Sequence, residues 1–278
     1  MKKIENQNFV GERSLFKSHD LEINNCIFHD GESPLKESSN LNITNTTFDW
    51  KYPLWYGNNF QVKNSTFTPN ARAGIWYSNN LVFQDCIIDA PKLFRRCNHL
   101  SIENIKFTNG EETLWHCKDV KLVNVEADKS YFAMDCENLE VDHLILNGNY
   151  GFDSCKNIHI TNSTLHTKDA FWNCENVIIE DSTIIGEYLA WNGKNITLIN
   201  CHIESLQGLC YIENLKIINC TFIKTPLAFE YCSLDVDIDG VIECVKNPIS
   251  GTIKCKSIQE LILDDEKIDK NNLHIIYK

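Results

Sequence analysis

The chain has 278 residues and a formal net charge of −12 at pH 7, with 23% charged residues. This balance is typical of a folded acidic protein and argues against a general binder of nucleic acid or anionic membranes, which needs a basic surface. No apolar run reaches the roughly 20 residues of a membrane-spanning helix, and the first residues lack the apolar stretch of a secretion signal. We therefore expect a cytoplasmic protein whose thirteen cysteines are reduced thiols.

An eight-residue phrase recurs along the chain. It begins with residues 21–28 (LEINNCIF) and 41–48 (LNITNTTF), and residues 4–9 match its end. Successive copies start at residues 21, 41, 60, 81, 100, 120, 139, 158, 177, 196, 215 and 234. A period of about 19 residues is typical of a solenoid, in which each repeat forms one coil.

Apolar and polar residues alternate within each phrase, with one interruption at the fifth place. This pattern predicts a strand, a tight bend and a second strand. The bend residue is one that tolerates the left-handed backbone, and a second series of Asn residues precedes the phrases. We predict that both series stack into hydrogen-bonded ladders. The first series is Asn6, Asn25, Asn45, Asn64, Asp85, Asn104, Asn124, His143, Asn162, Asp181, Asn200 and Asn219, and the second is Asn40, Asn59, Asn80, Asn138, Asn157, Asn176, Asn195 and Asn214.

A further apolar-centred triplet begins six residues before each phrase and predicts a third short strand. Three strands per repeat predict an all-β parallel β-helix of about 12 coils of about 19 residues over residues 1–241. Residues 242–278 lose the period, and we expect them to be a C-terminal capping segment of the same domain. A leucine-rich repeat has a similar period, but its return segment conflicts with the extra strand signals and with only eight Ala.

The Asn ladders resemble those of the pectate-lyase-like superfamily of right-handed parallel β-helices. Within it, five aromatic segments resemble the bacterial DUF3737 family, which has no established reaction. These are segments 50–56, 71–77, 168–173, 186–192 and 227–231, which read WKYPLWY, ARAGIWY, KDAFWN, GEYLAWN and LAFEY. The resemblance implies a right-handed parallel β-helix and no particular activity or cofactor.

Aromatic and basic residues gather on one predicted face, at the third strand of each repeat and the loop before it. Five of the six Trp residues follow the inward residue of that strand, so alternation directs them outward. Aromatic faces suit the apolar faces of sugar rings, and Arg side chains suit hydroxyls and carboxylates. We predict a face that binds a saccharide or another small polar ligand through Trp55, Tyr56, Arg72, Trp76, Tyr77, Lys92, Arg96, Trp115, Tyr131, Tyr150, Asp169, Trp172, Tyr188 and Trp191. Its basic residues lie in the early repeats, where an acidic glycan would prefer to bind.

Four residues on this face are candidate catalytic groups. Glycoside hydrolysis needs two carboxylates roughly 5–10 Å apart, and Asp135 and Asp153 fall in neighbouring repeats, with His116 one repeat earlier. The superfamily resemblance implies an Arg or Lys base for lyase chemistry, for which Arg95 is a candidate. An enzyme of this kind would be a polysaccharide lyase or a glycoside hydrolase. The short loops predict a shallow, open face, however, and this favours binding over catalysis.

The sequence predicts neither a metal cluster nor a cofactor site, because the cysteines form single-residue columns and only His116 among the nine His lies on the aromatic face. An alternative function is a structural protein that forms homo-oligomers through the aromatic face, since Trp, Tyr and Arg are common at protein interfaces.

Overall fold

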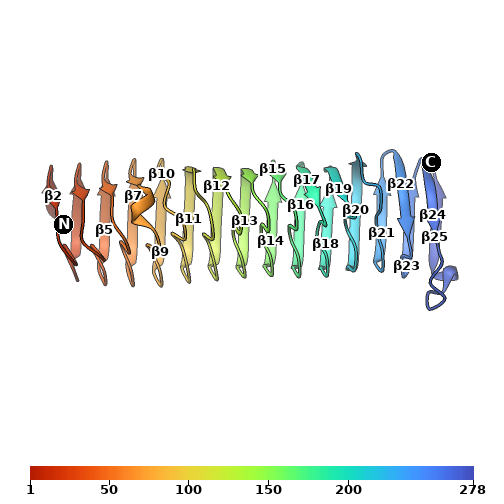
Figure 1. The fold of residues 1–278 in the computed structure, drawn as a ribbon, viewed down its shortest axis with the longest axis horizontal. Helices are drawn as coiled ribbons and strands as arrows, with labels where there is room; N and C mark the ends of the chain where they lie inside the picture. The colour runs from red at the N-terminus through yellow and green to blue at the C-terminus, as the bar shows by residue number, and fades with distance from the viewer. The chain divides into compact units, whose positions relative to one another are not determined.

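The computed structural model describes residues 1–278. The chain forms two compact units, unit 1 (Met1–Glu140) and unit 2 (Val141–Lys278). Both consist of short β-strands wound in coils, and the helical segments are two three-residue 3₁₀ turns, Pro69–Ala71 and Lys270–Asn272 (Figure 1). No helix has the length and apolar character that crossing a membrane would require.

Unit 1 contains twelve complete strands. They are β1 (Lys2–Glu5), β2 (Asn8–Phe9), β3 (His19–Asn24), β4 (Ile27–Phe28), β5 (Ser39–Thr44), β6 (Thr47–Phe48), β7 (Asn58–Lys63), β8 (Thr66–Phe67), β9 (Asn79–Gln84), β10 (Ile87–Ile88), β11 (Asn98–Phe107) and β12 (Lys118–Asp128). Strand β13 (Glu137–Asn147) spans the boundary between the units.

Unit 2 continues the alternation of strands and turns. Its strands are β14 (Lys156–Thr161), β15 (Thr164–His166), β16 (Glu175–Glu180), β17 (Thr183–Glu187), β18 (Lys194–Ile199), β19 (His202–Leu206), β20 (Glu213–Phe222), β21 (Ser233–Ile238), β22 (Val241–Lys246), β23 (Ser250–Cys255), β24 (Ser257–Ile262) and β25 (Leu273–Tyr277).

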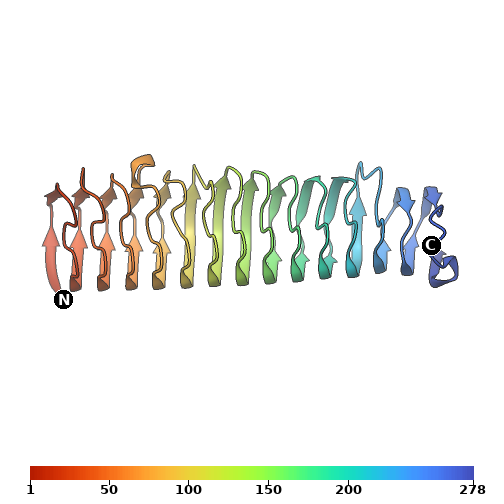
Figure 2. The same cartoon turned by 60° about the horizontal axis from the view of Figure 1, so that its bottom comes forward.

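The register of the strands confirms the repeat read from the sequence. In unit 1, Leu21 pairs in parallel with Leu41, and Leu41 with Phe60. In unit 2, Val177 pairs with Ile196, and Ile196 with Leu215. Each first residue of a phrase therefore lies beside the first residue of the next, and Figure 2 shows the strands side by side within each unit. The fold is the predicted parallel β-solenoid.

Both predicted bend series are confirmed. Every residue of the two series has φ between 48° and 63°, the left-handed region that Asn tolerates best. The Asn104 amide donates to Asp85 at 2.9 Å, and Asn124 donates to Asn104 at 3.1 Å. In unit 2, Asn214 donates to Asn195 at 2.9 Å. These bonds between coils satisfy the amides at the bends and fix the register.

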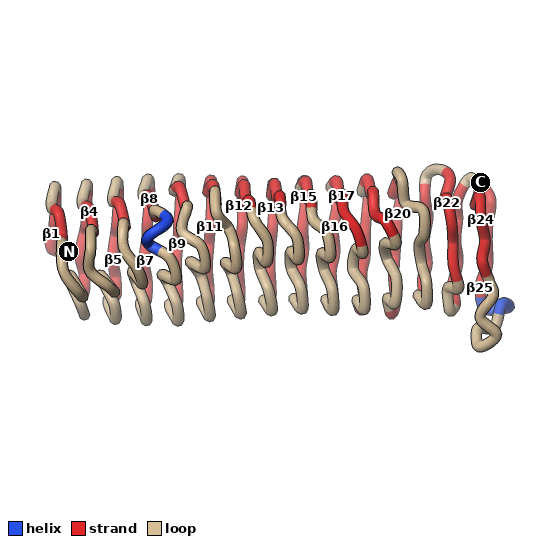
Figure 3. The backbone as a smooth tube through the Cα atoms, viewed as in Figure 1, coloured by secondary structure: helices blue, strands red, loops and turns tan.

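The prediction of a third short strand in each coil is wrong. The segment is instead a turn in which alternate residues are left-handed, as at Tyr52 (φ 63°), Leu54 (φ 61°) and Tyr56 (φ 55°). Successive turns still exchange backbone hydrogen bonds, such as Leu54 N–H to Pro34 O at 3.0 Å and Tyr56 N–H to Trp76 O at 2.9 Å. Side chains therefore keep the predicted inward and outward alternation, although the backbone is not extended. Figure 3 shows these turns in tan in successive coils.

The core of each unit is built from columns of like side chains. In unit 1, Phe28, Phe48 and Phe67 are fully buried, and consecutive rings stack at 5.0 and 4.8 Å. All thirteen cysteines are free thiols and buried, as their small apolar side chains suggest. Each buried Phe contributes about 1.5–3 kcal/mol, so the interior stabilises every coil separately.

Residues 242–278 extend the solenoid. Strand β21 pairs in parallel with β23, β23 with β25, and β22 with β24. The predicted count of about 12 coils is therefore too low, and the fold has about 15 turns. The sequence hid these turns because Pro248 and the acidic loop 263–272 shift the spacing between phrases.

Candidate functional site

The aromatic residues predicted as a binding face lie on the outward side of the turns. We call this surface the turn face and separate two columns on it. The tryptophan column holds the residue after each inward turn residue, namely Lys36, Trp55, Trp76, Arg95, Trp115 and Met134 in unit 1. The tyrosine column holds the next residue, namely Glu37, Tyr56, Tyr77, Arg96, His116 and Asp135. The tyrosine-column residues are left-handed, with φ between 52° and 59°.

The indoles of the tryptophan column stack on one another. Trp55 and Trp76 have ring centroids 5.2 Å apart with an interplanar angle of 9°. In unit 2, Trp172 and Trp191 lie at 5.8 Å and 10°. Because the coil spacing is about 4.8 Å, neighbouring rings cover each other's faces and present mainly their edges to solvent.

Each of these indoles also donates a hydrogen bond to the next coil. The Nε1–H groups of Trp76 and Trp115 donate to the backbone carbonyls of Lys92 and Tyr131 at 2.9 and 2.8 Å. Trp55, Trp172 and Trp191 donate in the same way to Ala73, Tyr188 and Gln207 at 2.6, 2.7 and 2.9 Å. All five acceptors are left-handed turn residues. The Trp residues therefore hold successive turns together.

This geometry corrects the predicted role of the tryptophans. We expected open aromatic faces for sugar rings, but the five indoles are half-buried and their N–H groups are already bonded. The stacking faces of Trp55 and Trp172 are covered by the neighbouring rings. What the turn face offers to a partner is a set of ring edges and the tyrosine column.

Arg95 occupies the place of an indole in the tryptophan column. Its guanidinium carbon lies 5.0 Å from the ring centroid of Trp76 and 4.3 Å from that of Trp115. Its Nη2 pairs with Glu112 at 2.6 Å, and Lys92 pairs with the same carboxylate at 3.0 Å. Its Nε is buried without a hydrogen-bond partner. Arg95 is thus fixed between two rings, and the structure gives no support for its predicted role as a base.

The tyrosine column of unit 1 is exposed. The rings of Tyr56 and Tyr77 stack at 5.0 Å, and they are 49% and 39% exposed. The Arg96 guanidinium lies 6.0 Å from the centroid of Tyr77, and the Lys36 ammonium lies 5.5 Å from that of Tyr56. These contacts align two cations with the stacked phenols.

In the turns of Tyr56 and Tyr77 and the turns on either side of them, three cations have no carboxylate within ion-pairing distance: Lys36, Arg72 and Arg96. The neighbouring Lys17, Lys51 and Lys92 each have one, at 3.4, 3.1 and 3.0 Å. The sequence missed Lys36 as a site residue because its column position alone does not show whether a carboxylate faces it.

Two of the predicted catalytic residues meet in unit 1. His116 Nδ1 lies 2.6 Å from Asp135 Oδ2, and both side chains are well exposed. The carboxylate orients the imidazole, as in many acid–base sites. Asp153, the other predicted carboxylate, lies in unit 2 and accepts hydrogen bonds from Ser154 and Asn173 at 2.9 and 3.2 Å. The predicted pairing of Asp135 with Asp153 thus gains no support, and Asp153 has a local structural role.

The turn face of unit 2 differs in chemistry. Asn173 and Asn192 stand in its tyrosine column, followed by one exposed phenol, Tyr211, and Asn192 donates to Asn173 at 3.5 Å. Asp169, predicted as a binding residue, is only 4% exposed, and burial raises the pKa of its carboxyl. Lys168 pairs with Glu187 at 3.0 Å. This face therefore has fewer free polar groups than the face of unit 1.

The remaining predicted binding residues lie in the loop before each turn. Tyr131 is 37% exposed, whereas Tyr150 and Tyr188 are half-buried. Tyr188 packs edge-on against Trp191 at 5.4 Å, with the Lys168 ammonium 5.4 Å from its centroid. Arg72 is exposed and Lys92 is paired with Glu112. The loop residues thus divide into an exposed set in unit 1 and a packed set in unit 2.

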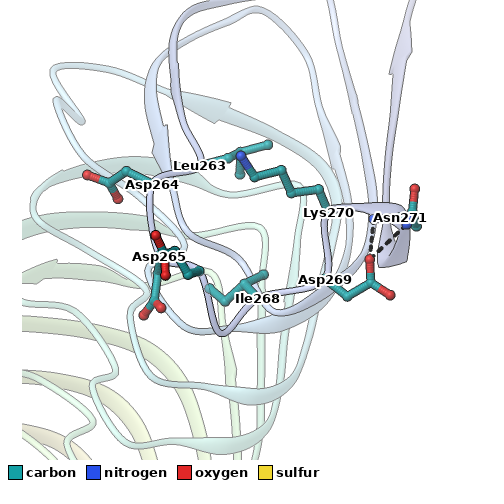
Figure 4. Close-up of a pocket in the computed structure, with 8 residues that line it drawn as sticks. Leu263, Asp264, Asp265, Ile268, Asp269, Lys270 and Asn271 are labelled. Atoms are coloured by element: carbon teal, nitrogen blue, oxygen red, sulfur yellow. Dashed lines mark hydrogen bonds between the residues drawn. The ribbon is translucent and has the colours of Figure 1, made fainter.

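A hollow of about 550 Å³ lies within the acidic loop of unit 2, lined by residues 263–266 and 268–271 (Figure 4). Three of its four carboxylates bond to the protein itself. The Asn247 amide donates to Asp264 at 2.7 Å, the Tyr231 hydroxyl donates to Asp265 at 2.9 Å, and Asp269 accepts from Asn271. The loop is therefore held by internal bonds. No group of three or more His, Cys, Asp or Glu side chains is arranged to hold a metal ion.

These features define the class of protein, a parallel β-solenoid with a stacked aromatic turn face. Residues 2–276 match the family described as "Protein of unknown function (DUF3737)", and the chain belongs to this family. A search of curated proteins gave no match.

Solved structures show distant likeness in fold. The surface adhesin PfbA of Streptococcus pneumoniae is 10% identical, with 92% of this chain and 82% of that chain covered and a TM-score of 0.38. The A-module of the mannuronan C-5 epimerase AlgE6 of Azotobacter vinelandii is 12% identical, with 99% and 87% covered and a TM-score of 0.30. The corresponding AlgE4 module is 8% identical, with 100% and 91% covered and a TM-score of 0.28. At these identities the likeness concerns the fold alone.

Proposed function

We propose that the chain binds an anionic polysaccharide along the turn face of unit 1 and does not transform it. The observation that carries the proposal is the set of three cations without carboxylate partners. Lys36 and Arg96 lie beside the exposed phenols of Tyr56 and Tyr77, and the exposed Arg72 lies in the loop before the turn of Tyr77. A guanidinium presents a fork of N–H donors that fits a carboxylate or sulfate group.

The expected mode of binding uses hydrogen bonds more than ring stacking. The edges and hydroxyls of the stacked phenols face outward, so they can contact the hydroxyls and C–H groups of a sugar without displacing a neighbouring ring. The coils repeat every 4.8 Å or so, and a linear polysaccharide likewise repeats its charged group at regular steps. Each coil can then meet an equivalent part of the ligand.

Binding suits this face better than catalysis. The Arg95 guanidinium is held by Glu112 and two indoles, and the His116–Asp135 pair stands on an open surface where water is not excluded. The chemistry that remains is recognition of charge and hydroxyls. We also propose a reducing, cytoplasmic location, which fits thirteen free cysteines.

Self-association through the same face is the second candidate. Exposed Tyr and Arg side chains are typical of interface hot spots, and the ring edges of Tyr56 and Tyr77 would pack well against a second copy. In this case light scattering would detect a dimer, and an Arg96→Asp substitution would convert it to monomers.

The proposal is tested by calorimetric titration with polygalacturonate and heparin, with dextran as the neutral polysaccharide. We expect binding to the two anionic polymers, weakened by salt, and at least tenfold weaker binding by an Arg72→Gln/Arg96→Gln variant. Lys216→Gln, which removes an exposed lysine of unit 2, is the control and should bind as the wild type does. Equal binding to dextran, or no binding to either anionic polymer, would overturn the proposal.

A further inference from the structure

Unit 1 has a second polar surface, distinct from the turn face. A shallow trough of about 380 Å³ lies over strands β7, β9, β11 and β12. Its lining comprises Asn59, Asn80, Leu81, Val82, His99, Leu100, Ser101, Asp119 and Lys121. This volume is at the lower end of the range of roughly 300–1,000 Å³ found for small-ligand sites.

Two outward columns form the walls of the trough. One wall is a strand column in which Val82 pairs in register with Ser101, and Ser101 with Lys121. The other wall is the bend column of Asn80 and His99, two positions earlier in each coil. Leu81 and Leu100 point inward between the walls and are 1% exposed, so the backbone forms the floor. Because the side chain of Ser101 is short, it leaves room for the trough between the two walls.

The Asn ladder is interrupted at this trough. The Asn59 amide donates to Asn40 at 2.8 Å, but the Asn80 amide donates across to Asn58 rather than to Asn59. The next bend residue is His99, whose Nδ1 lies 3.2 Å from Asp119. The amide oxygens of Asn59 and Asn80 consequently have no donor within the protein, and neither the Ser101 hydroxyl nor the Lys121 ammonium has a partner.

Unit 2 provides an internal comparison. There Thr197 stands in register between Ile178 and Lys216, just as Ser101 stands between Val82 and Lys121. The adjacent bend column is an unbroken ladder, with Asn195 donating to Asn176 at 2.8 Å and Asn214 to Asn195 at 2.9 Å. The strand column is therefore similar, and the interrupted ladder is what leaves polar atoms free in unit 1.

We propose that this trough binds a single sugar acid, such as a uronate monosaccharide. The free amide oxygens accept from ligand hydroxyls, and the Ser101 hydroxyl donates to or accepts from them. The Val82 side chain, 44% exposed, contacts the apolar side of the ring. The Asp119 carboxylate is engaged by His99 at 3.2 Å and by a 2.8 Å hydrogen bond from the Asn138 amide, so the Lys121 ammonium is the group that pairs with the ligand carboxylate.

Ligand-observed saturation-transfer NMR with galacturonate, and with galactose as the neutral analogue, tests the site. We expect saturable binding of galacturonate and at least tenfold weaker binding of galactose. Ser101→Trp, which fills the trough, should abolish binding, and Lys121→Gln should weaken it about tenfold. The matched controls in unit 2, Thr197→Trp and Lys216→Gln, should leave binding unchanged.

The outcome is separable from that of the turn-face proposal. Arg72→Gln/Arg96→Gln should retain galacturonate binding in the trough, and Ser101→Trp should retain polysaccharide binding on the turn face. Absence of saturable galacturonate binding by the wild type would overturn the inference. So would binding that survives in a folded Ser101→Trp variant, or binding that Thr197→Trp removes to the same extent.

Discussion

The turn faces of units 1 and 2 share a backbone but differ in the chemistry that they expose. In both, alternate turn residues are left-handed and indole N–H groups donate to the next coil, as Trp115 and Trp172 do. In unit 1 the tyrosine column presents Tyr77 and Arg96, whereas unit 2 presents Asn173 and Asn192 at equivalent places. The tryptophan column is thus common to both units. The tyrosine columns share exposed phenols, since unit 2 has Tyr211, and they differ in the cation Arg96 of unit 1 and the amides of Asn173 and Asn192 in unit 2.

This difference separates structure from recognition. A residue that recurs on both faces with the same bond, like the tryptophans, stabilises the solenoid in either unit. A residue found on one face only, like Arg96, which contacts the Tyr77 ring but has no carboxylate partner, is not explained by the shared backbone. The proposed recognition function is therefore assigned to unit 1 as a hypothesis, and the following variants test that hypothesis.

The largest effect is expected from removing a tryptophan in either unit. Trp115→Ala and Trp172→Ala should each lower the free energy of unfolding by about 3 kcal/mol, because each loses ring packing and a hydrogen bond between coils. Phe at the same positions keeps most of the packing and should cost about 1 kcal/mol. Urea unfolding followed by circular dichroism measures both values.

The two units should respond alike in this experiment. A loss at Trp115 but none at Trp172 would mean that the indole has a structural role in unit 1 only. The Phe variants serve as the control for packing, since they differ from the wild type mainly in the indole N–H.

The second effect concerns recognition. A Tyr77→Asn/Arg96→Asn variant gives unit 1 the chemistry of unit 2, and Asn suits the left-handed backbone at both positions (φ 59° and 52°). We expect stability to be retained and polygalacturonate binding to fall at least tenfold by titration calorimetry. Tyr211→Asn, at an exposed left-handed position of unit 2, should leave binding intact. Similar losses in both variants would remove the distinction between the faces.

The third effect is smaller and concerns the cation that replaces an indole in unit 1. Arg95→Met keeps contact with Trp76 and Trp115 but removes the ion pair with Glu112. The expected loss is about 1 kcal/mol, because the substitution also removes the buried Nε that lacks a partner, and Glu112 keeps Lys92. Urea unfolding should show this difference, and a loss above about 3 kcal/mol would mean that Arg95 does more than fill the column.

Most of the fold could be predicted from the sequence because its rules are local. The period, the inward alternation and the left-handed Asn bends each follow from a few neighbouring residues, as at Asn104 and Asn200. The third strand could not, because Leu54 and Leu114 adopt a left-handed backbone that apolar residues seldom prefer. Bonding between coils stabilises that conformation, and alternation alone does not report it.

The site was less predictable, for a related reason. Column positions correctly gathered Trp76, Tyr77 and Arg96 on one face, but they gave no ring orientation or hydrogen-bond partner. One regularity in the sequence could have indicated the indole hydrogen bonds. The donor and the acceptor are 16 residues apart from Trp115 to Tyr131, and this spacing recurs from Trp172 to Tyr188 and from Trp191 to Gln207. The pairing of Arg95 with Glu112 depends on rotamers, which the sequence leaves open.

The smallest expected effect is on the pH dependence of stability, and it shows whether the carboxylates of unit 2 have a structural role. Burial raises the pKa of Asp169, so the native state holds its proton more tightly than the unfolded chain does. By linkage, the free energy of unfolding falls as pH rises above 3.8 through the raised pKa. Asp169→Asn removes this cost, so the difference between the thermal midpoint of the variant and that of the wild type should increase across that pH window and then level off.

The pH dependence expected from Asp142 is the reverse, because hydrogen bonds from Asn162, Thr161 and His143 lower the pKa of its carboxyl to about 2. Its stabilisation is complete above pH 3.8 and is lost as pH falls toward 2, so Asp142→Asn should be less stable than the wild type at neutral pH. If Asp169→Asn instead lowers the midpoint at neutral pH, the ionised carboxylate contributes a favourable contact, and the turn face of unit 2 has a charged group with a role of its own.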